Sequence, residues 1–291
     1  MNSDNFFCIG SSHVREGKPC EDYSLSGEII DGEKTYNYAI VSDGCSSSSN
    51  TDLGARMLCH QAVNDLYQFL PVGNESDSQI LSRHEDLGDS IVRGAAGSLA
   101  AFDCQSDAMH ATLCIALSDG ENHYINIYGD GCFIIAEEDK IHFYEIEYEG
   151  NAPHYYWYHY KFDDYDKYLD LVSERKRTIT RTTLGSLGEI LEVDICEEDF
   201  LTPNYLHVIN KDIKTLSVAS DGITSFEGEC HHYLKTVKEV CAHKNFAGDF
   251  VKRRILSMLK KNKKQSIDHY DDFSIATIHF GEINGTDDSK D

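Results

Sequence analysis

Two short apolar segments that each run straight into Ser-Asp-Gly are the feature that most constrains this chain. The letters YAIVSDG and LSVASDG read as buried strands that end at Asp43 and Asp221. An aspartate at the end of a buried strand is held rigidly, and the glycine after it lets the backbone turn sharply and leaves its carbonyl accessible. Two such strand ends, brought side by side, would form a cradle of hard oxygen ligands for Mg²⁺ or Mn²⁺.

The same tripeptide also has an ordinary interpretation, because Asp-Gly is a common turn. Ser118-Asp119-Gly120 lies between two strand patterns and predicts a hairpin turn. Asp130-Gly131 is open to the same interpretation. The tripeptide alone therefore does not separate a metal cradle from a turn, and the rest of the chain has to decide.

Strand and helix patterns are grouped along the chain rather than strictly alternating, which favours the α+β class. Apolar residues at three- to four-residue steps predict helices near residues 51–70, 87–102, 231–242 and 247–260. We expect a single domain over residues 1–282, with a Tyr-rich insertion or flap at about 145–185 and a disordered tail at 283–291.

Composition narrows the class of protein further. Fifty acidic against 26 basic side chains give a net charge of −24, which argues against binding to nucleic acid or to an anionic membrane. No secretory signal and no membrane-length apolar run is visible. The ten cysteines are scattered and form no C-x-x-C pair, so we expect a reducing, cytoplasmic setting. Five of them have apolar neighbours and are predicted to be small core residues: Cys8, Cys59, Cys114, Cys132 and Cys196.

Acidic clusters occur at four predicted strand boundaries, in an order that carries a resemblance. They are Glu21-Asp22, Asp43-Gly44, Asp221-Gly222 and Asp271-Asp272. Together with intervening motifs they form the series CEDYS, IVSDG, HATLCIAL, IYGDG, VASDGI and DDFSIATI, over roughly residues 5–280. This series resembles the protein phosphatase 2C family of metal-dependent serine/threonine phosphatases. The opening SSHVREGKPCEDYS is especially similar to its bacterial members.

The resemblance implies a four-layer α-β-β-α sandwich of two antiparallel sheets flanked by helix pairs, with two Mn²⁺ or Mg²⁺ ions in a cleft at one end. It implies hydrolysis of phosphoserine or phosphothreonine by a bridging water that the metals activate. Asp43 would bridge both ions, and Asp22 would hold water beside them. The other implied metal ligands are Glu21, the Gly44 carbonyl, Asp221 and Asp271, while Asp272 is expected to support the site.

The chain departs from the family pattern at the residues that would bind the phosphate and protonate the leaving group. Many members place a phosphate-gripping Arg where Gly17 stands here, and Arg15 is predicted to substitute for it, with Lys18 nearby. Cys45 occupies the position of a His thought to act as the acid for the leaving alcohol. His13 is a possible replacement for that His.

Two further positions concern a third metal ion, which the resemblance leaves doubtful. Asp107 fits one of its ligands, but Ser225 stands where the other acid is expected. Asp107 and Asp130 are therefore assigned supporting roles. Tyr155 to Tyr158, in the Tyr-rich segment, would form either a substrate platform or a local mini-core, and we favour the mini-core.

The leading hypothesis is a monomeric cytoplasmic phosphatase that acts on a phosphorylated protein, such as a target of a bacterial Ser/Thr kinase. The alternative is a catalytically weak or inactive family member that serves as a metal-binding interaction or sensing module. A third possibility is another metal-dependent hydrolase on an unrelated α+β fold. The retained carboxylates favour the first, and the missing Arg favours the second.

Overall fold

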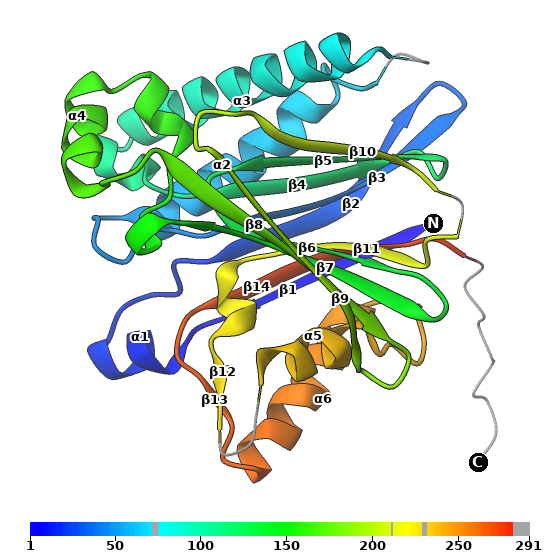
Figure 1. Ribbon diagram of the computed structural model, residues 1–291. Helices are drawn as coiled ribbons and strands as arrows, with labels where there is room; N and C mark the ends of the chain where they lie inside the picture. The colour runs from blue at the N-terminus through cyan, green and yellow to red at the C-terminus, as the bar shows by residue number, and fades with distance from the viewer. Residues whose placement is uncertain (72–74, 211, 229–231, 282–291) are drawn as a thin grey trace.

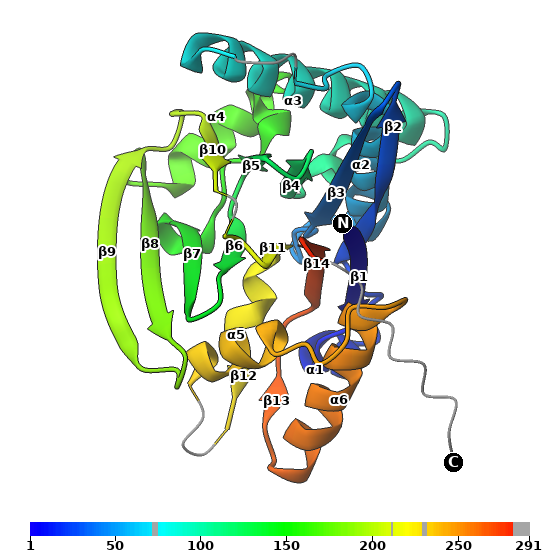
Figure 2. The same ribbon diagram turned by 90° about the vertical axis from the view of Figure 1, so that its right-hand side faces the viewer.

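The computed structural model describes residues 1–71, 75–210, 212–228 and 232–281. Two antiparallel sheets are stacked face to face, with helices on both outer sides (Figure 1). Helices α2 (Thr51–Leu66) and α3 (Asp77–Ala100) cover one sheet, and α5 (Tyr233–Cys241) and α6 (Phe250–Lys264) cover the other (Figure 2). The predicted α+β class and four-layer sandwich are confirmed.

The larger sheet has seven strands and the smaller has five. In spatial order the larger contains β1 (Asn2–Cys8), β14 (Phe273–His279), β11 (Thr215–Ala219), β6 (Gly131–Ala136), β7 (Lys140–Tyr148), β8 (Lys176–Gly185) and β9 (Ile190–Asp199). The smaller contains β10 (Asn204–Ile209), β5 (Asn122–Tyr128), β4 (Leu113–Ser118), β3 (Lys34–Ser42) and β2 (Tyr23–Asp31). A separate pair joins β12 (Phe226–Glu227) to β13 (Asp268–His269).

The central strands are apolar on both sides because each sheet is covered on both faces. Every residue of β4, β11 and β14 is buried. Between the sheets, Val41 of β3 and Val218 of β11 belong to one apolar cluster. A second cluster lies under α2 and α3, and a third lies under α5 and α6. These three layers of apolar contact hold the strand ends in fixed positions.

The predicted helices are present with shifted ends. Helix α2 ends at Leu66, four residues before the predicted end. Helix α3 begins at Asp77, ten residues before the predicted start, and a capping box between Ser76 and Gln79 accounts for that start. Helix α6 extends to Lys264. The prediction for α5 began at residue 231, and the predicted tail covers 283–291; both lie outside the described residues.

Two short helices were not predicted. They are α1 (Ser11–Glu16) and α4 (Phe162–Leu171), and neither has a long apolar period in the sequence. Helix α4 lies between β7 and β8 with three-residue and four-residue 3₁₀ turns at Glu149–Asn151 and Tyr156–His159. In this segment Tyr155 and Tyr158 are buried in the cluster between the sheets. None of the described helices is long and apolar enough to span a membrane.

The cysteine prediction was right for three residues and wrong for one. Cys59, Cys114 and Cys132 are fully buried, and Cys8 is half-buried. Cys196 is exposed, because β9 is the last strand of its sheet and is covered on neither face. Apolar neighbours in sequence do not bury a residue when the strand itself lies at an edge.

Candidate active site

Several acidic strand ends meet at one cavity of about 230 Å³. Asp43 follows β3, Asp130 lies in the turn between β5 and β6, Asp221 follows β11, and Asp271 precedes β14. The described lining residues are Asp43, Gly44, Cys45, Ser46, Ser47, Thr112, Asp130, Asn151, Pro153, Tyr155, Asp221 and Asp271. The structure therefore brings together five of the predicted site residues: Asp43, Gly44, Asp130, Asp221 and Asp271.

Backbone contacts fix these strand ends against one another. The Thr112 amide donates to the Asp43 carbonyl at 2.8 Å, and the Asp43 amide donates to Thr112 Oγ1 at 3.2 Å. The turn after β11 packs closely against the segment before β14. This contact depends on Gly222, because a Cβ there would lie 1.8 Å from the Asp272 carbonyl oxygen. The glycine of the second Asp-Gly is thus required for packing as well as for turning the chain.

Asp272 is a buried hub that holds the N-terminal acidic pair in place. Its Oδ1 accepts the Gly10 amide at 2.6 Å, and its Oδ2 accepts the Glu21 amide at 2.6 Å. His13 Nδ1 donates to the same Oδ2 at 2.9 Å. Three donors on one carboxylate show that Asp272 positions the segment before β2. It faces this network and does not line the cavity.

His13 continues this network toward the cavity. Its Nε2 lies 3.5 Å from Glu21 Oε2 and 3.2 Å from Ser46 Oγ, and Ser46 lines the cavity. His13 is itself buried, with both ring nitrogens engaged. Its observed contacts make it a positioning residue for Glu21 and for the 45–48 loop.

The carboxylates raise one another's pKa because they are buried and share a sign. Burial, followed by the charges of Asp22, Asp221 and other carboxylates, raises the pKa of Asp43 well above its usual value. The pKa of Asp130 is raised for the same two reasons. Burial raises the pKa of Asp271 to about 6 and that of Asp22 to about 8, although Ser220 Oγ donates to Asp22 at 2.6 Å.

The carboxylate oxygens at this cavity are suitable ligands for a divalent cation, although they are not close enough together to form a complete metal site. No three His, Cys, Asp or Glu side chains of the described residues are grouped so that they could hold a metal ion as they stand. Buried oxygens of Glu21, Asp22 and Asp221 nevertheless have no hydrogen-bond partner. Unpartnered buried carboxylate oxygens are costly, and a hard cation would satisfy them. The ligand chemistry therefore suits Mg²⁺ or Mn²⁺.

Positive charge is scarce around the cavity. No Lys or Arg is among the described residues that line it. Arg15 is exposed on α1, where its Nε donates to the Ser11 carbonyl of the same helix. Lys18 lies closer to the cavity, because its Nζ donates to the carbonyl of Ser46 at 2.9 Å. The predicted substitute Arg15 thus points along its own helix, and Lys18 is the cation that contacts the cavity rim.

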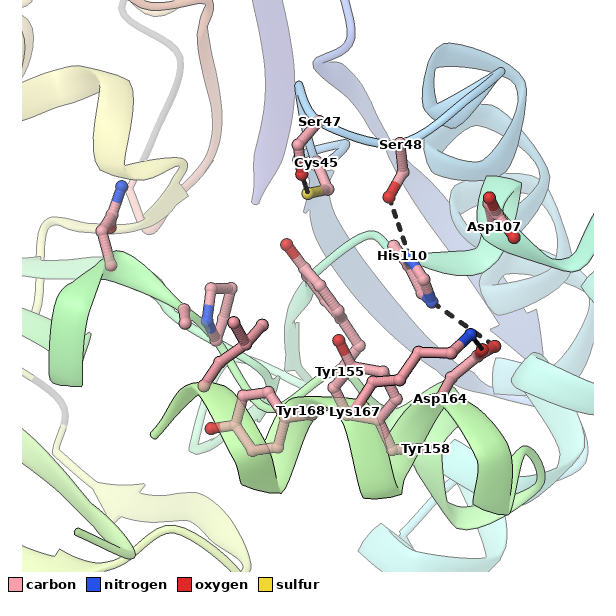
Figure 3. A pocket seen from close by; sticks show the side chains of 14 residues that line it. Cys45, Ser47, Ser48, Asp107, His110, Tyr155, Tyr158, Asp164, Lys167 and Tyr168 are labelled. Atoms are coloured by element: carbon pink, nitrogen blue, oxygen red, sulfur yellow. Dashed lines mark hydrogen bonds and ion pairs between the residues drawn. The ribbon is translucent and has the colours of Figure 1, made fainter. Parts of the chain in front are cut away.

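A second cavity of about 300 Å³ adjoins the first and shares Cys45, Ser47 and Tyr155 with it (Figure 3). Asp107 lines this second cavity and not the first. Within it, Ser48 Oγ lies 2.9 Å from His110 Nδ1, and His110 Nε2 lies 3.8 Å from Asp164 Oδ2. Lys167 donates to the other oxygen of Asp164 at 3.1 Å. The segment between β7 and β8 thus closes one wall of this cavity.

Sequence reasoning missed His110 and Asp164. His110 stands in the motif HATLCIAL, and its side chain reaches a cavity because Ala111 pairs with Gly44 at the cavity edge. Burial lowers its pKa. Cys45 lines the same cavity. Burial opposes ionisation of its thiol, but hydrogen bonds with Ser47 and Tyr155 outweigh that effect and lower the pKa of Cys45. No local signal in the sequence links Asp164 to this place.

Two antiparallel sheets between helix pairs, with carboxylates gathered at one end, define the class of fold seen in solved phosphatases. Serine/threonine phosphatase Stp1 from Staphylococcus aureus is similar over 97% of this chain and 96% of its own, with 11% identity and a TM-score of 0.55. A bacterial serine phosphatase is similar over 97% and 98%, with 11% identity and a TM-score of 0.53. A C. elegans sex determining protein is similar over 97% and 65%, with 12% identity and a TM-score of 0.52.

The sequence itself matches the protein phosphatase 2C family model over residues 9–149. This stretch contains Glu21, Asp22, Asp43 and Asp130. No curated protein sequence matches the chain. Residues 9–149, just under half of the chain, thus resemble the protein phosphatase 2C family in sequence, and the whole chain shares the fold of solved serine/threonine phosphatases. At identities near 11% the structural matches establish the fold, and activity has to be argued from the site.

Proposed function

We propose that this protein is a metal-dependent phosphatase that hydrolyses phosphoserine or phosphothreonine in a phosphorylated protein. One observation carries the proposal: four carboxylates from four separate chain segments line one cavity in which no described Lys or Arg offsets their charge. Such a cavity repels a phosphate unless cations are present. Two Mn²⁺ or Mg²⁺ ions, held by Asp43 with Glu21, Gly44, Asp221 and Asp271, would satisfy the unpartnered oxygens of Glu21 and Asp221.

The chemistry that divalent cations supply in such a site is neutralisation of the phosphate charge and activation of water for in-line attack. The chain's own residues would orient the reactants. Asp22 interacts electrostatically with Asp43, and its Oδ1, which has no hydrogen-bond partner, would accept a hydrogen bond from a water beside the metals. Ser220 holds the other oxygen of Asp22 and so fixes the direction of Oδ1. Asp272 and His13 hold Glu21 in register with this pair.

The phosphate and the leaving alcohol would be received at the rim of the cavity. Lys18 is a cation at this rim, because its Nζ donates to the Ser46 carbonyl of the 45–48 loop. Lys grips phosphate as a point charge and lacks the two-pronged geometry of Arg. We expect weaker binding of the phosphate group than an Arg would give, with Arg15 a minor contributor. Cys45, whose thiol pKa is lowered, lines both cavities and would lie near the leaving alcohol.

A second candidate function, a metal-binding interaction or sensing module with little turnover, rests on two observations. The cavity lacks an Arg among its described residues, and the carboxylates are not grouped as a finished metal cluster. Both candidates require the same carboxylates, so only turnover separates them.

The deciding experiment measures release of inorganic phosphate from phosphoserine, phosphothreonine and phosphotyrosine peptides with Mn²⁺, with Mg²⁺ and with EDTA. Thermal stability is recorded under the same conditions. The phosphatase predicts turnover of the first two peptides only with metal. Stabilisation by metal without turnover of any peptide would support the sensing module. The absence of both effects would remove the metal site from consideration.

The setting of the proposed reaction follows from the cysteines. The nine described cysteines are all free, which suits a reducing compartment, and we propose the cytoplasm. The substrate class is a protein phosphorylated by a Ser/Thr kinase, and we propose that the phosphatase acts as a monomer.

A further inference from the structure

Strand β9 is an exposed sheet edge of unusual composition. It is the last strand of the seven-stranded sheet, and β8 is its one described neighbour. Nine of its ten residues are exposed, and the tenth, Glu198, is half-buried. The other outermost strands, β1, β10 and β2, are largely half-buried. In Figure 2 β9 lies at the outer left margin of the molecule, beyond β8. Its outer backbone groups are therefore accessible to another strand.

The two faces of β9 differ in chemistry. Val193 and Ile195 are 49% and 67% exposed and lie on one face, opposite Thr182 and Thr180 of β8. Leu191 adds a further exposed apolar side chain at the β-bulge. Aliphatic side chains in alternate exposed positions of an edge strand are a hazard that proteins usually avoid. Their presence here indicates a surface that is covered part of the time.

The opposite face of β9 is acidic. Glu192 and Asp194 alternate with the apolar residues, and both form ion pairs with Arg181 of β8. One guanidinium serves two carboxylates, so a negative charge remains on this face. Further along this face, Glu198 pairs with Arg177 of β8.

We propose that β9 is a docking edge for an extended segment of a partner protein in which basic and β-branched apolar residues alternate. Such a segment adds to the sheet as a further strand through main-chain hydrogen bonds. Side chains of neighbouring strands lie on matching faces. Lys or Arg of the partner then lies beside Glu192 and Asp194, and Val or Ile lies beside Val193 and Ile195. This inference goes beyond the proposed phosphatase activity and does not depend on it.

Two other occupants fit less well. A second copy pairing β9 with β9 would set Glu192 and Asp194 against the same acidic residues, and like charges across strands are destabilising. The chain's own residues 282–291 have the sequence EINGTDDSKD, with four acids and one lysine, so their charge also opposes docking. Charge complementarity therefore selects a basic partner.

The test uses the full chain and a fluorescent peptide as long as β9, 10 residues, that alternates lysine and valine. A control peptide has the same composition with the lysines and valines in separate blocks. We expect saturable one-to-one binding of the alternating peptide and clearly weaker binding of the block peptide. Amide hydrogen exchange should slow in Ile190–Asp199 and not in Asn204–Ile209, the edge of the other sheet.

Protein variants test the contributions of the acidic and the apolar face of β9 to peptide binding separately. Glu192→Lys with Asp194→Lys is expected to weaken binding by more than about tenfold, because opposed charges become like charges. Val193→Ser with Ile195→Ser removes the apolar contact and should also weaken binding. Glu138→Lys with Asp139→Lys makes the same change of net charge in the exposed turn after β6, and should leave binding nearly unchanged. Asp43→Asn should bind the peptide as the parent does.

Four results would overturn the proposal. Equal binding of the block peptide, or equal weakening by the change at 138–139, would mean attraction to net charge alone. No binding of the alternating peptide would reject the docking edge outright. A dimer of the parent in sedimentation velocity, dissociated by Val193→Ser with Ile195→Ser, would assign the edge to a second copy.

Discussion

Ser42-Asp43-Gly44 and Ser118-Asp119-Gly120 are the same tripeptide at the ends of two neighbouring strands, β3 and β4. These strands are antiparallel, so their ends, and the two aspartates, lie at opposite ends of the sheet. Asp119 forms a hairpin turn: its Oδ1 accepts the amides of Glu121 and Asn122 at 3.0 and 2.8 Å. Asp43 instead lies among other carboxylates in the cavity.

The two environments shift the acidity of the same side chain in opposite directions. Burial raises the pKa of Asp119 somewhat, but hydrogen bonds from Asn122 and Glu121 outweigh it and lower the net pKa. Burial and like charges raise the pKa of Asp43. A carboxylate satisfied by its own turn has no need of a cation, whereas one held among carboxylates does. The end of the sheet at which the tripeptide lies thus decides its chemistry.

The largest expected difference is in activity. Asp43→Asn should lower kcat/KM for a phosphopeptide in Mn²⁺ by more than about a hundredfold, because it removes charge from the proposed metal cradle. Asp119→Asn is the matched control. It keeps an oxygen for the turn amides and should leave kcat/KM within about twofold of the parent. Similar kcat/KM values for the two variants would contradict the assignment of the cavity.

Substitution of Gly222 and of Gly120 by alanine should lower the stability of the protein by different amounts. Gly222→Ala places a Cβ 1.8 Å from the backbone carbonyl of Asp272 and should cost about 3 kcal/mol in the free energy of unfolding. Gly120→Ala meets no backbone atom but adopts a φ of +93°, which should cost about 1 kcal/mol. Urea unfolding without metal measures both. A larger loss at Gly120 would mean that the turn, and not the packing of strand ends, limits stability.

Metal ions should stabilise the folded protein only by binding in the acidic cavity. At a hundredfold excess over its dissociation constant, Mn²⁺ should raise the free energy of unfolding of the parent by about 2.7 kcal/mol. Asp119→Asn should show the same gain, and Asp43→Asn should lose most of it. Differential scanning fluorimetry at increasing Mn²⁺ concentrations measures the stabilisation of each variant. An undiminished gain in Asp43→Asn would place the bound ion elsewhere.

A further expected difference concerns pH in the absence of metal. The pKa of Asp22 is about 8 in the folded protein, above the usual 3.8, so the folded state binds more protons than the unfolded chain between these values. Its contribution to stability is complete below pH 4 and is lost as the pH rises toward 8. Asp119, with a lowered pKa, has the opposite sign: its contribution is lost only as the pH falls through its folded pKa.

In EDTA, the free energy of unfolding should therefore decline from pH 5 to pH 8, and Asp22→Asn should flatten the decline. Asp119→Asn should keep the parent's slope over that range. Saturating Mn²⁺ should remove the decline in the parent, since it holds the carboxylates ionised. A slope that Asp22→Asn leaves unchanged would mean that other groups titrate.

The local features of this site could be predicted from the sequence alone. Asp43 and Asp221 could be placed at the ends of buried strands because apolar runs and the Asp-Gly turn are local signals. The hairpin at Asp119 was predicted for the same reason. The order of six short motifs indicated the family and the sandwich, since each motif lies where a strand ends.

Contacts between distant segments could not be read in this way. Asp272 holds Gly10, His13 and Glu21 across about 250 residues of chain, and that role depends on strands β1 and β14 being paired. The cavity formed by His110 and Asp164 depends on how the segment after β7 packs. Cys196 looked like a core residue until β9 proved to be an edge.

The amino-acid sequence by itself determined which residues end strands, which carry charge and where the chain turns. The tertiary structure alone decided which of these ends face each other and which lie alone. The physical reason is that strand and turn preferences act between neighbours in the chain, whereas burial and like-charge repulsion arise only when distant segments share one space. Asp43 and Asp119 have the same neighbours in their tripeptides, and the fold gives them opposite environments.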